Sequence, residues 1–384
     1  IYQQQDYTIT NNEIASYRDG LRMEYTYQGL DFADNYVHNN TAYGIYTYYS
    51  ANSNARSNPF TIENNRFVDN QYGVYRSDSS SSYGYSFHIK DYSNKYSNLV
   101  SNISNHSDYY LNNKFICSTS AERYISPENA CILGNNKKAK IALVGDSHLD
   151  LITLELEKKL ISNNVSAYQF SYGGCVPSLN LKVFKDKRYN CDEYFRDVLK
   201  QIKNKNEIEK ILLFSRWSFN LKGERFNNQE GGLEIGDGHY FIPLDKDFLV
   251  EKNIRKKIIL SNIEMFIKEL VSLNKEIYIV TPTPEMGWEI PNNLARIVHY
   301  KKKIDLETLS ISKKVFIERN KEILSFLKDL KEKYNLKLIY PDDIFCNDLR
   351  CFSHQNNVPL FFDDDHLSSE GAKLLSEKII NNIF

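Results

Sequence analysis

The chain has 384 residues, of which 41% are hydrophobic and 25% are charged, and only 16 are Gly and 9 are Pro. This length predicts two domains, or one large domain with an extension, and this composition excludes a wholly disordered, collagen-like or low-complexity protein. Because 48 Lys and Arg nearly balance 49 Asp and Glu, no global positive charge attracts nucleic acid or anionic lipid, and neutral or weakly charged partners fit better.

The distribution of apolar residues indicates whether the sequence contains a membrane-spanning helix. No stretch approaches the roughly 20 consecutive apolar residues of a membrane-spanning helix, and no charged-then-apolar leader opens the sequence. We therefore expect the chain as given to be soluble. Because it begins at Ile1 instead of Met, we expect a processed protein or a segment of a longer one.

The amino-acid composition changes near residue 115. Only two lysines, Lys90 and Lys95, precede Lys114, whereas 18 of the 28 Tyr lie there among many Asn and Ser. Lys, Leu and Ile become frequent afterwards. We therefore expect two domains of different architecture: a β-rich, Asn- and Tyr-rich repeat region over residues 1–114, and a second domain over residues 115–384.

Three segments of the first region are alike. Each has an apolar residue, two further residues, an Asn, a short polar stretch and a Gly with β-forming neighbours; the Asn and Gly pairs are Asn12 and Gly20, Asn35 and Gly44, and Asn65 and Gly73. This period is typical of stacked solenoids, and the pattern resembles the coils of a right-handed parallel β-helix. The alternative is a strand-and-loop region with chance similarity. A β-helix of the tailspike type would make the chain a homotrimer.

Strand-like and helical patterns alternate after Lys140. Short apolar runs predict strands over residues 140–144, 165–172, 211–214, 276–280 and 336–340. Helical periodicity predicts helices over residues 149–162, 192–203, 251–273, 311–334 and 368–380. The alternation predicts an α/β domain whose parallel sheet is covered on both faces, with its chemistry at the carboxyl ends of the strands.

All six cysteines follow residue 115 as three local couples: Cys117 with Cys131, Cys175 with Cys191, and Cys346 with Cys351. The even number suggests disulfides, although the sequence alone does not choose among the possible pairings. No couple has the Cys-x-x-Cys spacing of zinc or thioredoxin-type sites. We favour an oxidising compartment (periplasm, cell surface or secreted) over a cytosolic enzyme with six buried thiols.

Two motifs next to predicted strands and helices suit nucleophilic catalysis. Gly145-Asp-Ser-His148 follows the first predicted strand, which places the Ser147 hydroxyl at the sheet edge beside the N–H groups of a helix N-terminus. Asp363 and His366 precede the last predicted helix and are separated by two residues, so the carboxylate can orient the imidazole toward a serine. Taken singly, the motifs are also explained by helix caps and a solvated acidic turn.

These motifs resemble the first and last blocks of the SGNH hydrolase superfamily. The closer resemblance is to the SGNH domains at the carboxyl end of acyltransferase-3 membrane proteins, which O-acetylate bacterial surface polysaccharides. It rests on residues 130–134, 145–148, 174–177, 214–218 and 362–368. It implies a flavodoxin-like, three-layer α/β fold over residues 115–384. It does not cover residues 1–114, and the chain as given does not contain the multi-helix membrane domain.

The resemblance assigns catalytic roles. Ser147 is expected to be the nucleophile, His366 the general base and Asp363 its orienter, so that an acyl-serine intermediate forms and is then resolved. No motif calls for a metal ion or a cofactor.

The expected oxyanion hole departs from the family pattern. Its donors would be the backbone N–H of Ser147 and that of Gly173 or Gly174. The third block of the family supplies an Asn, but the corresponding strand end here reads Ser-Arg-Trp-Ser. Arg216 in that segment either replaces the amide donor or pairs with a carboxylate such as Asp146.

Other residues near the predicted strand ends have two interpretations. Trp217 and Trp288 either stack on a sugar ring or are ordinary packing residues. His148 is a possible second base, but a structural hydrogen bond is the commoner role at its position. The glycine-rich segment 219–240 lies where it can cover the site.

Two functional hypotheses follow. The first is a serine-dependent O-acyl (above all O-acetyl) esterase or O-acyltransferase acting on cell-surface or extracellular polysaccharide, with the acyl donor supplied by a membrane acyltransferase domain or partner. Whether water or a sugar hydroxyl resolves the acyl-enzyme stays open. The second is a non-catalytic glycan-binding or adhesion protein of the phage tailspike kind, with a degenerate SGNH domain. In both, the partner is a polysaccharide and not nucleic acid.

Overall fold

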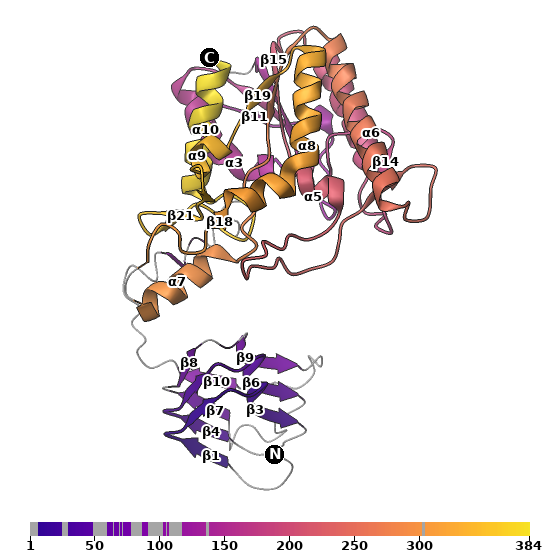
Figure 1. Ribbon diagram of the computed structural model, residues 1–384. Helices are drawn as coiled ribbons and strands as arrows, with labels where there is room; N and C mark the ends of the chain where they lie inside the picture. Colours follow the sequence, from indigo (N-terminus) through magenta and orange to yellow (C-terminus); the bar gives the residue numbers. More distant parts are fainter. Residues whose placement is uncertain are drawn as a thin grey trace. The chain divides into compact units, whose positions relative to one another are not determined.

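The computed structural model describes residues 7–24, 30–48, 60–63, 65–68, 70, 72–77, 87–90, 103–104, 106, 117–135, 138–301 and 304–384. Contacts divide the chain into two compact units, Ile1–Lys95 and Tyr96–Phe384 (Figure 1). The predicted domain boundary at residue 114 falls outside the described residues and stays a prediction. Each unit is described by itself.

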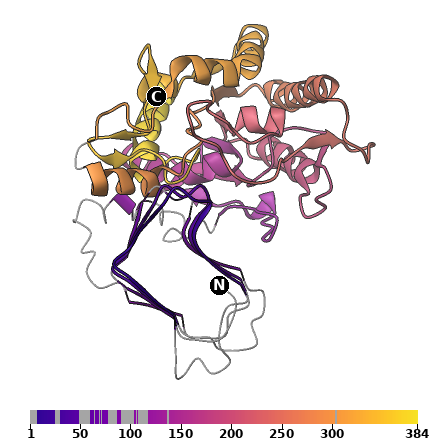
Figure 2. The ribbon, with the colours of Figure 1, turned by 60° about the horizontal axis from the view of Figure 1, so that its bottom comes forward.

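The first unit is β-rich, and the strands that the structure describes in it form three parallel sheets. Each of the first three repeats places one strand in each sheet, and Figure 2 shows the repeats superimposed along the stack. The first sheet contains β1 (Tyr7–Thr10), β4 (Leu30–Ala33), β7 (Phe60–Glu63) and β10 (Phe87–Lys90). The second contains β2 (Glu13–Ala15), β5 (Tyr36–His38) and β8 (Arg66–Val68), and the third contains β3 (Asp19–Glu24), β6 (Tyr43–Tyr48) and β9 (Tyr72–Ser77).

Register in this unit follows from apolar and Asn residues at equivalent positions. Phe32 of β4 pairs with Ile62 of β7, and both side chains are buried. The predicted Asn positions form a ladder, in which Asn12 Nδ2 donates to Asn35 Oδ1 at 3.1 Å and Asn35 Nδ2 donates to Asn65 Oδ1 at 2.9 Å. These amide bonds satisfy polar groups at the turn that would otherwise be costly to bury.

The second unit contains a six-stranded sheet in the order β11-β13-β12-β15-β17-β19. The five predicted strands are confirmed as β12 (Ile141–Gly145), β13 (Ala167–Ser171), β15 (Lys210–Phe214), β17 (Glu276–Val280) and β19 (Lys337–Ile339), all parallel. The edge strand β11 (Ile132–Leu133) is antiparallel and was not predicted.

Helices cover both faces of this sheet, as the sequence predicts (Figure 1). Alternate residues of β12 enter different cores: Ile141 and Leu143 face one, Ala142 and Val144 the other. The first core also contains side chains of α3 (Ser147–Ser162) and α10 (Ser369–Ile383). The second contains those of α4 (Cys191–Asn204), α6 (Lys252–Ser272) and α8 (Lys313–Tyr334).

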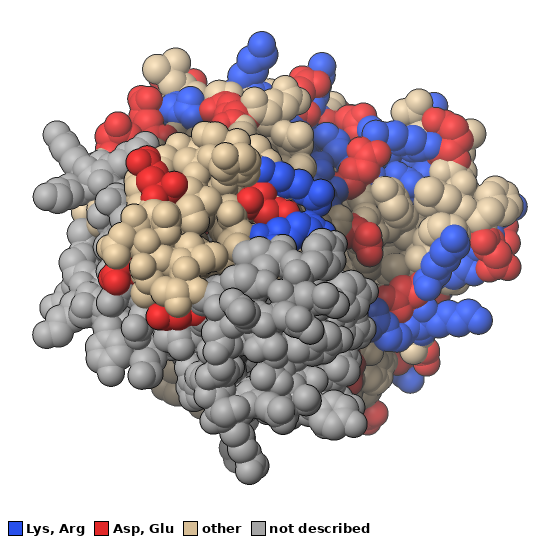
Figure 3. Space-filling view, turned by 90° about the horizontal axis from the view of Figure 1, so that it is seen from below, with Lys and Arg blue, Asp and Glu red and all other residues tan. Residues whose placement is uncertain are grey.

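Shorter elements connect this framework. They are the 3-10 helix η2 (Pro127–Asn129), α5 (Trp217–Lys222), α7 (Ile290–Lys301) and α9 (Asp342–Phe345), with the strand pairs β14 (Leu181–Val183) and β16 (Phe241–Pro243), β18 (Ile311–Ser312) and β20 (Arg350–Cys351), and β21 (His354–Gln355) and β22 (Val358–Pro359). Among the described residues, no helix combines the length and apolar character needed to cross a membrane. Figure 3 shows acidic and basic side chains interspersed on the face that it displays.

All three predicted cysteine couples are disulfides. Cys117–Cys131 ties an earlier segment to the residue directly before β11, and Cys175–Cys191 ties the loop after β13 to the start of α4.

The disulfides differ in the length of chain that they close, and this leads to a stability prediction. Replacing Cys117 and Cys131, 14 residues apart, by Ala should lower the free energy of unfolding by about 3 kcal/mol, since an open loop gives the unfolded chain more conformational freedom. Replacing Cys346 and Cys351, 5 residues apart, should cost only about 2 kcal/mol. Urea denaturation of both double variants measures the difference; a larger loss for the shorter loop would contradict the loop-length argument.

Candidate functional site

Ser147 lies where the central strand β12 gives way to helix α3. The strand ends at Gly145, Asp146 is the helix N-cap, and Ser147 is the first helical residue. The Asp146 carboxylate accepts the His148 backbone N–H at 3.0 Å and the Arg216 backbone N–H at 2.9 Å. Asp146 therefore fixes the turn that carries Ser147, and it also ties this turn to the end of the neighbouring strand β15.

His366 lies in the turn before α10, which packs against α3. Asp363 shapes this turn, because its Oδ1 accepts the backbone N–H groups of Asp365 at 2.9 Å and His366 at 2.7 Å. The other oxygen of Asp363 accepts the Nδ1–H of His366 at 2.7 Å. Nε2 of His366 then faces Ser147 Oγ at 2.9 Å. The structure thus brings together the three residues predicted from the two motifs, as a hydroxyl, an imidazole and a carboxylate in hydrogen-bonding sequence.

The surroundings of His366 favour its charged form. Burial lowers the pKa of this imidazole, but Coulombic attraction by Asp363 and Asp365, together with the hydrogen bond that His366 donates to Asp363, more than offsets burial and raises the pKa to about 10. These carboxylates therefore stabilise an imidazolium, the species that forms when His366 takes a proton from Ser147.

Two backbone N–H groups near Ser147 have no hydrogen-bond partner among the described residues. One belongs to Ser147 and the other to Gly174, which follows β13 with a φ of +79°. The sequence left open which glycine is the donor. Gly173 N–H donates to the Thr119 carbonyl at 2.9 Å, so its hydrogen is already used. Of the two glycines, only Gly174 offers a free N–H.

Comparison with known proteins gives this geometry a context. Residues 116–381 match the family of SGNH domains that are fused to AT3 domains. The chain belongs to this family. No curated protein sequence matches the chain.

Solved structures resemble the SGNH domain at low sequence identity. The periplasmic domain of a lipopolysaccharide acetyltransferase from Salmonella ser. Paratyphi A is 18% identical, with a TM-score of 0.51 over 74% of this chain and 99% of its own. Est24, a carbohydrate acetylesterase from Sinorhizobium meliloti, is 9% identical, with a TM-score of 0.35 over 64% of this chain and 100% of its own. A lipase/acylhydrolase from Enterococcus faecalis is 15% identical, with a TM-score of 0.31 over 64% and 95%. The first of these likenesses shows the α/β fold of the SGNH domain.

The structure corrects the prediction that Arg216 donates to the oxyanion. Its guanidinium is buried and donates to both oxygens of Glu234, at 2.9 and 2.7 Å, and to Glu285 at 2.8 Å. Its Nε also lies 3.0 Å from Asp365 Oδ2. Of the two interpretations of Arg216, carboxylate pairing is the observed one, although the side-chain partners are not Asp146. The pairing with Glu234 also anchors the glycine-rich segment 219–240 to the strand end of the SGNH domain.

Trp217 is a packing residue, which corrects its prediction as a sugar-stacking side chain. It is fully buried in the core between the sheet and α6, and its indole N–H donates to the Val280 carbonyl at 2.8 Å. Trp288 is half-buried, and its ring lies beside Gly232 of the glycine-rich segment. A sugar contact of Trp288 stays a prediction.

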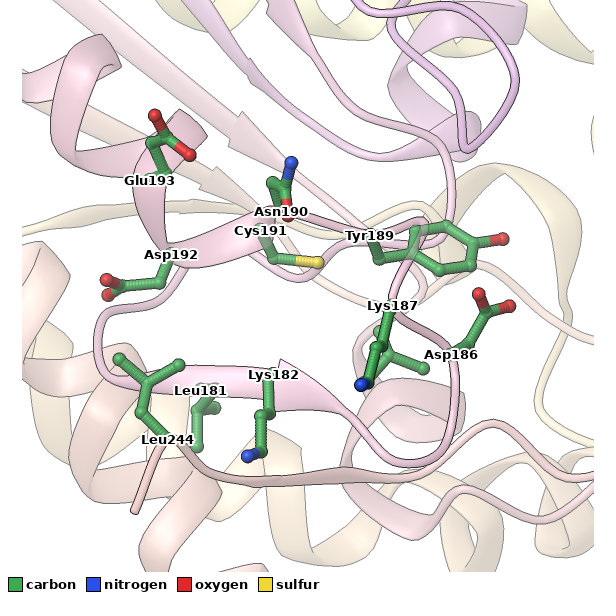
Figure 4. Close-up of a pocket in the computed structure, with 11 residues that line it drawn as sticks. Leu181, Lys182, Asp186, Lys187, Tyr189, Asn190, Cys191, Asp192, Glu193 and Leu244 are labelled. Carbon is green, nitrogen blue, oxygen red and sulfur yellow. The ribbon is translucent and has the colours of Figure 1, made fainter. Parts of the chain in front are cut away.

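A pocket of about 310 Å³ lies between β14 and the start of α4 (Figure 4). Lys182, Lys187 and Asp186 are among its lining residues, so its wall carries both charges. None of the predicted site residues lines it. Two of its lining residues approach the site region: the ring of Tyr189 lies close to Gly174, and Cys191 forms a disulfide with Cys175.

The sequence did not reveal the part played by Asp365. This residue is buried and accepts the Nε2–H of His148 at 2.8 Å. The hydrogen bond agrees with the structural role favoured for His148. Taken alone, the run Asp363 to Asp365 is also explained by a solvated acidic turn, and only the fold shows that the side chain of its third residue is buried.

Proposed function

We propose that this protein is a serine-dependent O-acyl esterase or O-acyltransferase, acting on O-acetyl groups of a cell-surface or extracellular polysaccharide. The observation that carries the proposal is the contact series from Ser147 Oγ through His366 to Asp363, with distances of 2.9 and 2.7 Å, at the amino end of α3. Membership of the SGNH family supports hydrolase or acyltransferase chemistry.

The geometry supports a two-step mechanism. As Ser147 Oγ attacks the ester carbonyl carbon, His366 Nε2 accepts the hydroxyl proton, and Asp363 stabilises the imidazolium through Nδ1. The N–H groups of Ser147 and Gly174 donate to the developing oxyanion. His366 then gives the proton to the leaving alkoxide, which leaves an acyl-serine. In the second step His366 deprotonates water or a sugar hydroxyl, and this nucleophile attacks the acyl-serine. The bond between the acyl carbon and Ser147 Oγ then breaks, the acid or the new sugar ester leaves, and Oγ takes the proton back from His366.

The proposed location and partners rest on the family and the disulfides. Three disulfides favour an oxidising compartment, and the similar solved domain from Salmonella is described as periplasmic. That domain belongs to a lipopolysaccharide acetyltransferase, which supports a polysaccharide as the acceptor or substrate. The family's fusion to AT3 domains supports an acyl donor supplied by a membrane acyltransferase domain or partner.

For the first unit we propose a parallel β-helix segment that binds the same glycan. The support is the stacking of three parallel sheets with an Asn ladder at one turn. This unit is also the specific reason to retain the second candidate function, a glycan-binding protein of the tailspike kind. Sedimentation equilibrium tests the second candidate: the tailspike form requires a trimer, so a monomer would exclude it, whereas the enzyme is compatible with either result.

A fluorophosphonate probe tests the catalytic proposal directly. We expect the protein to be labelled stoichiometrically, and Ser147→Ala to abolish labelling, because the probe reacts only with an activated serine hydroxyl. Ser162→Ala, at the exposed far end of the same helix, is the matched control and should label like the wild type. Equal labelling of wild type and Ser147→Ala, or no labelling of either, would exclude the assignment.

The same preparation distinguishes transfer from hydrolysis. An acetyl ester donor is supplied with and without an oligosaccharide acceptor, and released acetate and acetylated saccharide are both measured. A sugar-dependent increase in turnover with acetylated product identifies a transferase; acetate alone, independent of the acceptor, identifies an esterase.

A further inference from the structure

A second imidazole–carboxylate pair lies directly behind the proposed catalytic one. His148, the residue after Ser147, donates from Nε2 to Asp365 Oδ2 at 2.8 Å, and both side chains are only 3% exposed. The centroids of the His148 and His366 rings are 4.7 Å apart. The proposed mechanism uses neither His148 nor Asp365, yet both are buried against its base.

Arg216 holds Asp365 from the other side. Its Nε lies 3.0 Å from the same Asp365 oxygen that accepts from His148. The guanidinium is fixed in turn, because Glu234 binds it with two oxygens and Glu285 bridges it to Arg319. Burial raises the pKa of Asp365, but the charges of Arg216 and His366 and the hydrogen bond from His148 more than offset burial and lower it. Asp365 is therefore an ionised carboxylate whose Oδ2 accepts a hydrogen bond from His148 and forms an ion pair with Arg216.

This restraint determines which carboxylate orients the base. The free oxygen of Asp365, Oδ1, lies 3.5 Å from Nδ1 of His366, too far for a good hydrogen bond, whereas Asp363 Oδ2 lies at 2.7 Å. Rotation of Asp365 toward His366 would break its contacts with His148 and Arg216. Among the described residues, Asp363 is thus left as the single hydrogen-bonding partner of His366 Nδ1.

The charges around His366 are mostly negative. On its own turn are Asp363 and Asp365, and also Asp364, whose pKa of about 8 leaves it mostly protonated at neutral pH. Glu234 comes from the glycine-rich segment, Glu285 and Glu289 follow β17, and His148 belongs to α3. The cations among the described residues include Arg216 after β15, Arg319 on α8 and Arg225, which pairs with Glu234. The carboxylates favour the imidazolium, and Arg216 opposes it. If the imidazolium is too stable, His366 stays protonated and cannot accept the Ser147 proton. The positive charge of Arg216 beside Asp365 therefore matters for catalysis.

We propose that His148 and Arg216 are positioning residues, which hold Asp365 away from Nδ1 of His366. Asp363 alone then orients the His366 ring, and the ring can still lose its proton and act as a base. The inference rests on the proposed function, since it assigns the residues a part in setting the base of the same site. It assigns no contact with substrate to either residue.

The test is an NMR titration of the His366 ring, which does not depend on activity. The Cε1–Hε1 signal of His366 is assigned among the 8 histidines by its loss in His366→Gln. Asp365→Asn removes a negative charge and should lower the pKa of His366 by about one unit. His148→Leu removes the donor that holds Asp365 Oδ2, so Asp365 can turn toward Nδ1 and the pKa of His366 should rise by about one unit. His148→Gln retains a side-chain donor and should restore the wild-type value.

The pH dependence of kcat/KM for p-nitrophenyl acetate supplies the second measurement. Its rising limb should move to lower pH in Asp365→Asn and to higher pH in His148→Leu, because the neutral imidazole is the active form. Damage to folding alone would lower activity without moving the limbs in opposite directions. An unchanged His366 pKa in both variants would overturn the positioning role. If Ser147→Ala keeps wild-type activity, the proposed function fails instead, and the NMR titration still decides the positioning role.

Discussion

Replacing Asp363 by Asn should lower kcat for ester cleavage by about 10⁴-fold while the protein remains folded. The Asn carbonyl oxygen can still accept the backbone N–H groups of Asp365 and His366 that Asp363 Oδ1 accepts now. Its amide, however, would donate to Nδ1 of His366 and place the ring hydrogen on Nε2. Nε2 could then no longer accept the Ser147 proton, which it faces at 2.9 Å. Single-turnover kinetics with p-nitrophenyl acetate measure the loss.

Asp364→Asn is a matched control on the same turn. Burial and the neighbouring charges of Asp365 and Asp363 raise the pKa of Asp364 to about 8, so at pH 6 the substitution exchanges a neutral acid for a neutral amide. We expect it to change kcat far less than Asp363→Asn. Equal losses in the two variants would mean that the turn itself, and not the orientation of His366, is what the activity requires.

Most of the framework of the second unit could be predicted because it depends on local patterns. The buried parallel strands are short apolar runs, as at residues 141–145 and 276–280, and the helices between them repeat their apolar residues along one face. The edge strand β11 has only two residues, Ile132 and Leu133, which is too short for any periodicity to show.

The triad residues could be predicted because each half of the site is local. Ser147 stands at a strand end, and Asp363 reaches His366 within one turn of chain. Only the meeting of the two halves depends on the fold, and the alternation of strands and helices implied it.

The surroundings of the site could not be predicted, because they depend on pairing between distant segments. Arg216 is 69 residues from Glu285 in the sequence, and no motif links them. The buried pairing with Glu234 and Glu285 follows from how the glycine-rich segment and the end of β17 pack against the end of β15. For the same reason Trp217 was a plausible sugar-binding residue until the structure placed it in the core.

Gly145→Ala should lower the free energy of unfolding by about 3 kcal/mol and kcat by about 100-fold. A Cβ at residue 145 would lie 1.9 Å from the Phe214 carbonyl oxygen and 2.8 Å from Leu149 Cβ. The carbonyl belongs to the backbone of the adjacent strand β15, so no side-chain rotation relieves the clash, and β12 and β15 must separate. Asp146 bonds to the end of β15, so this separation displaces the turn that carries Ser147. Urea denaturation and ester kinetics measure the two effects.

Gly173→Ala is a control that distinguishes the close approach of backbone to Gly145 from the loss of a glycine as such. Gly173 also lies near Ser147, but a Cβ there would find its nearest atoms at 3.7 Å (Thr119 carbonyl oxygen) and 3.9 Å (Ser147 Cβ), which are ordinary contacts. We expect its stability to stay within about 1 kcal/mol of the wild type. If Gly145→Ala changed the free energy of unfolding equally little, β12 and β15 would have to separate without loss of stability. The close packing that aligns Ser147 with His366 would then not be what fixes the site.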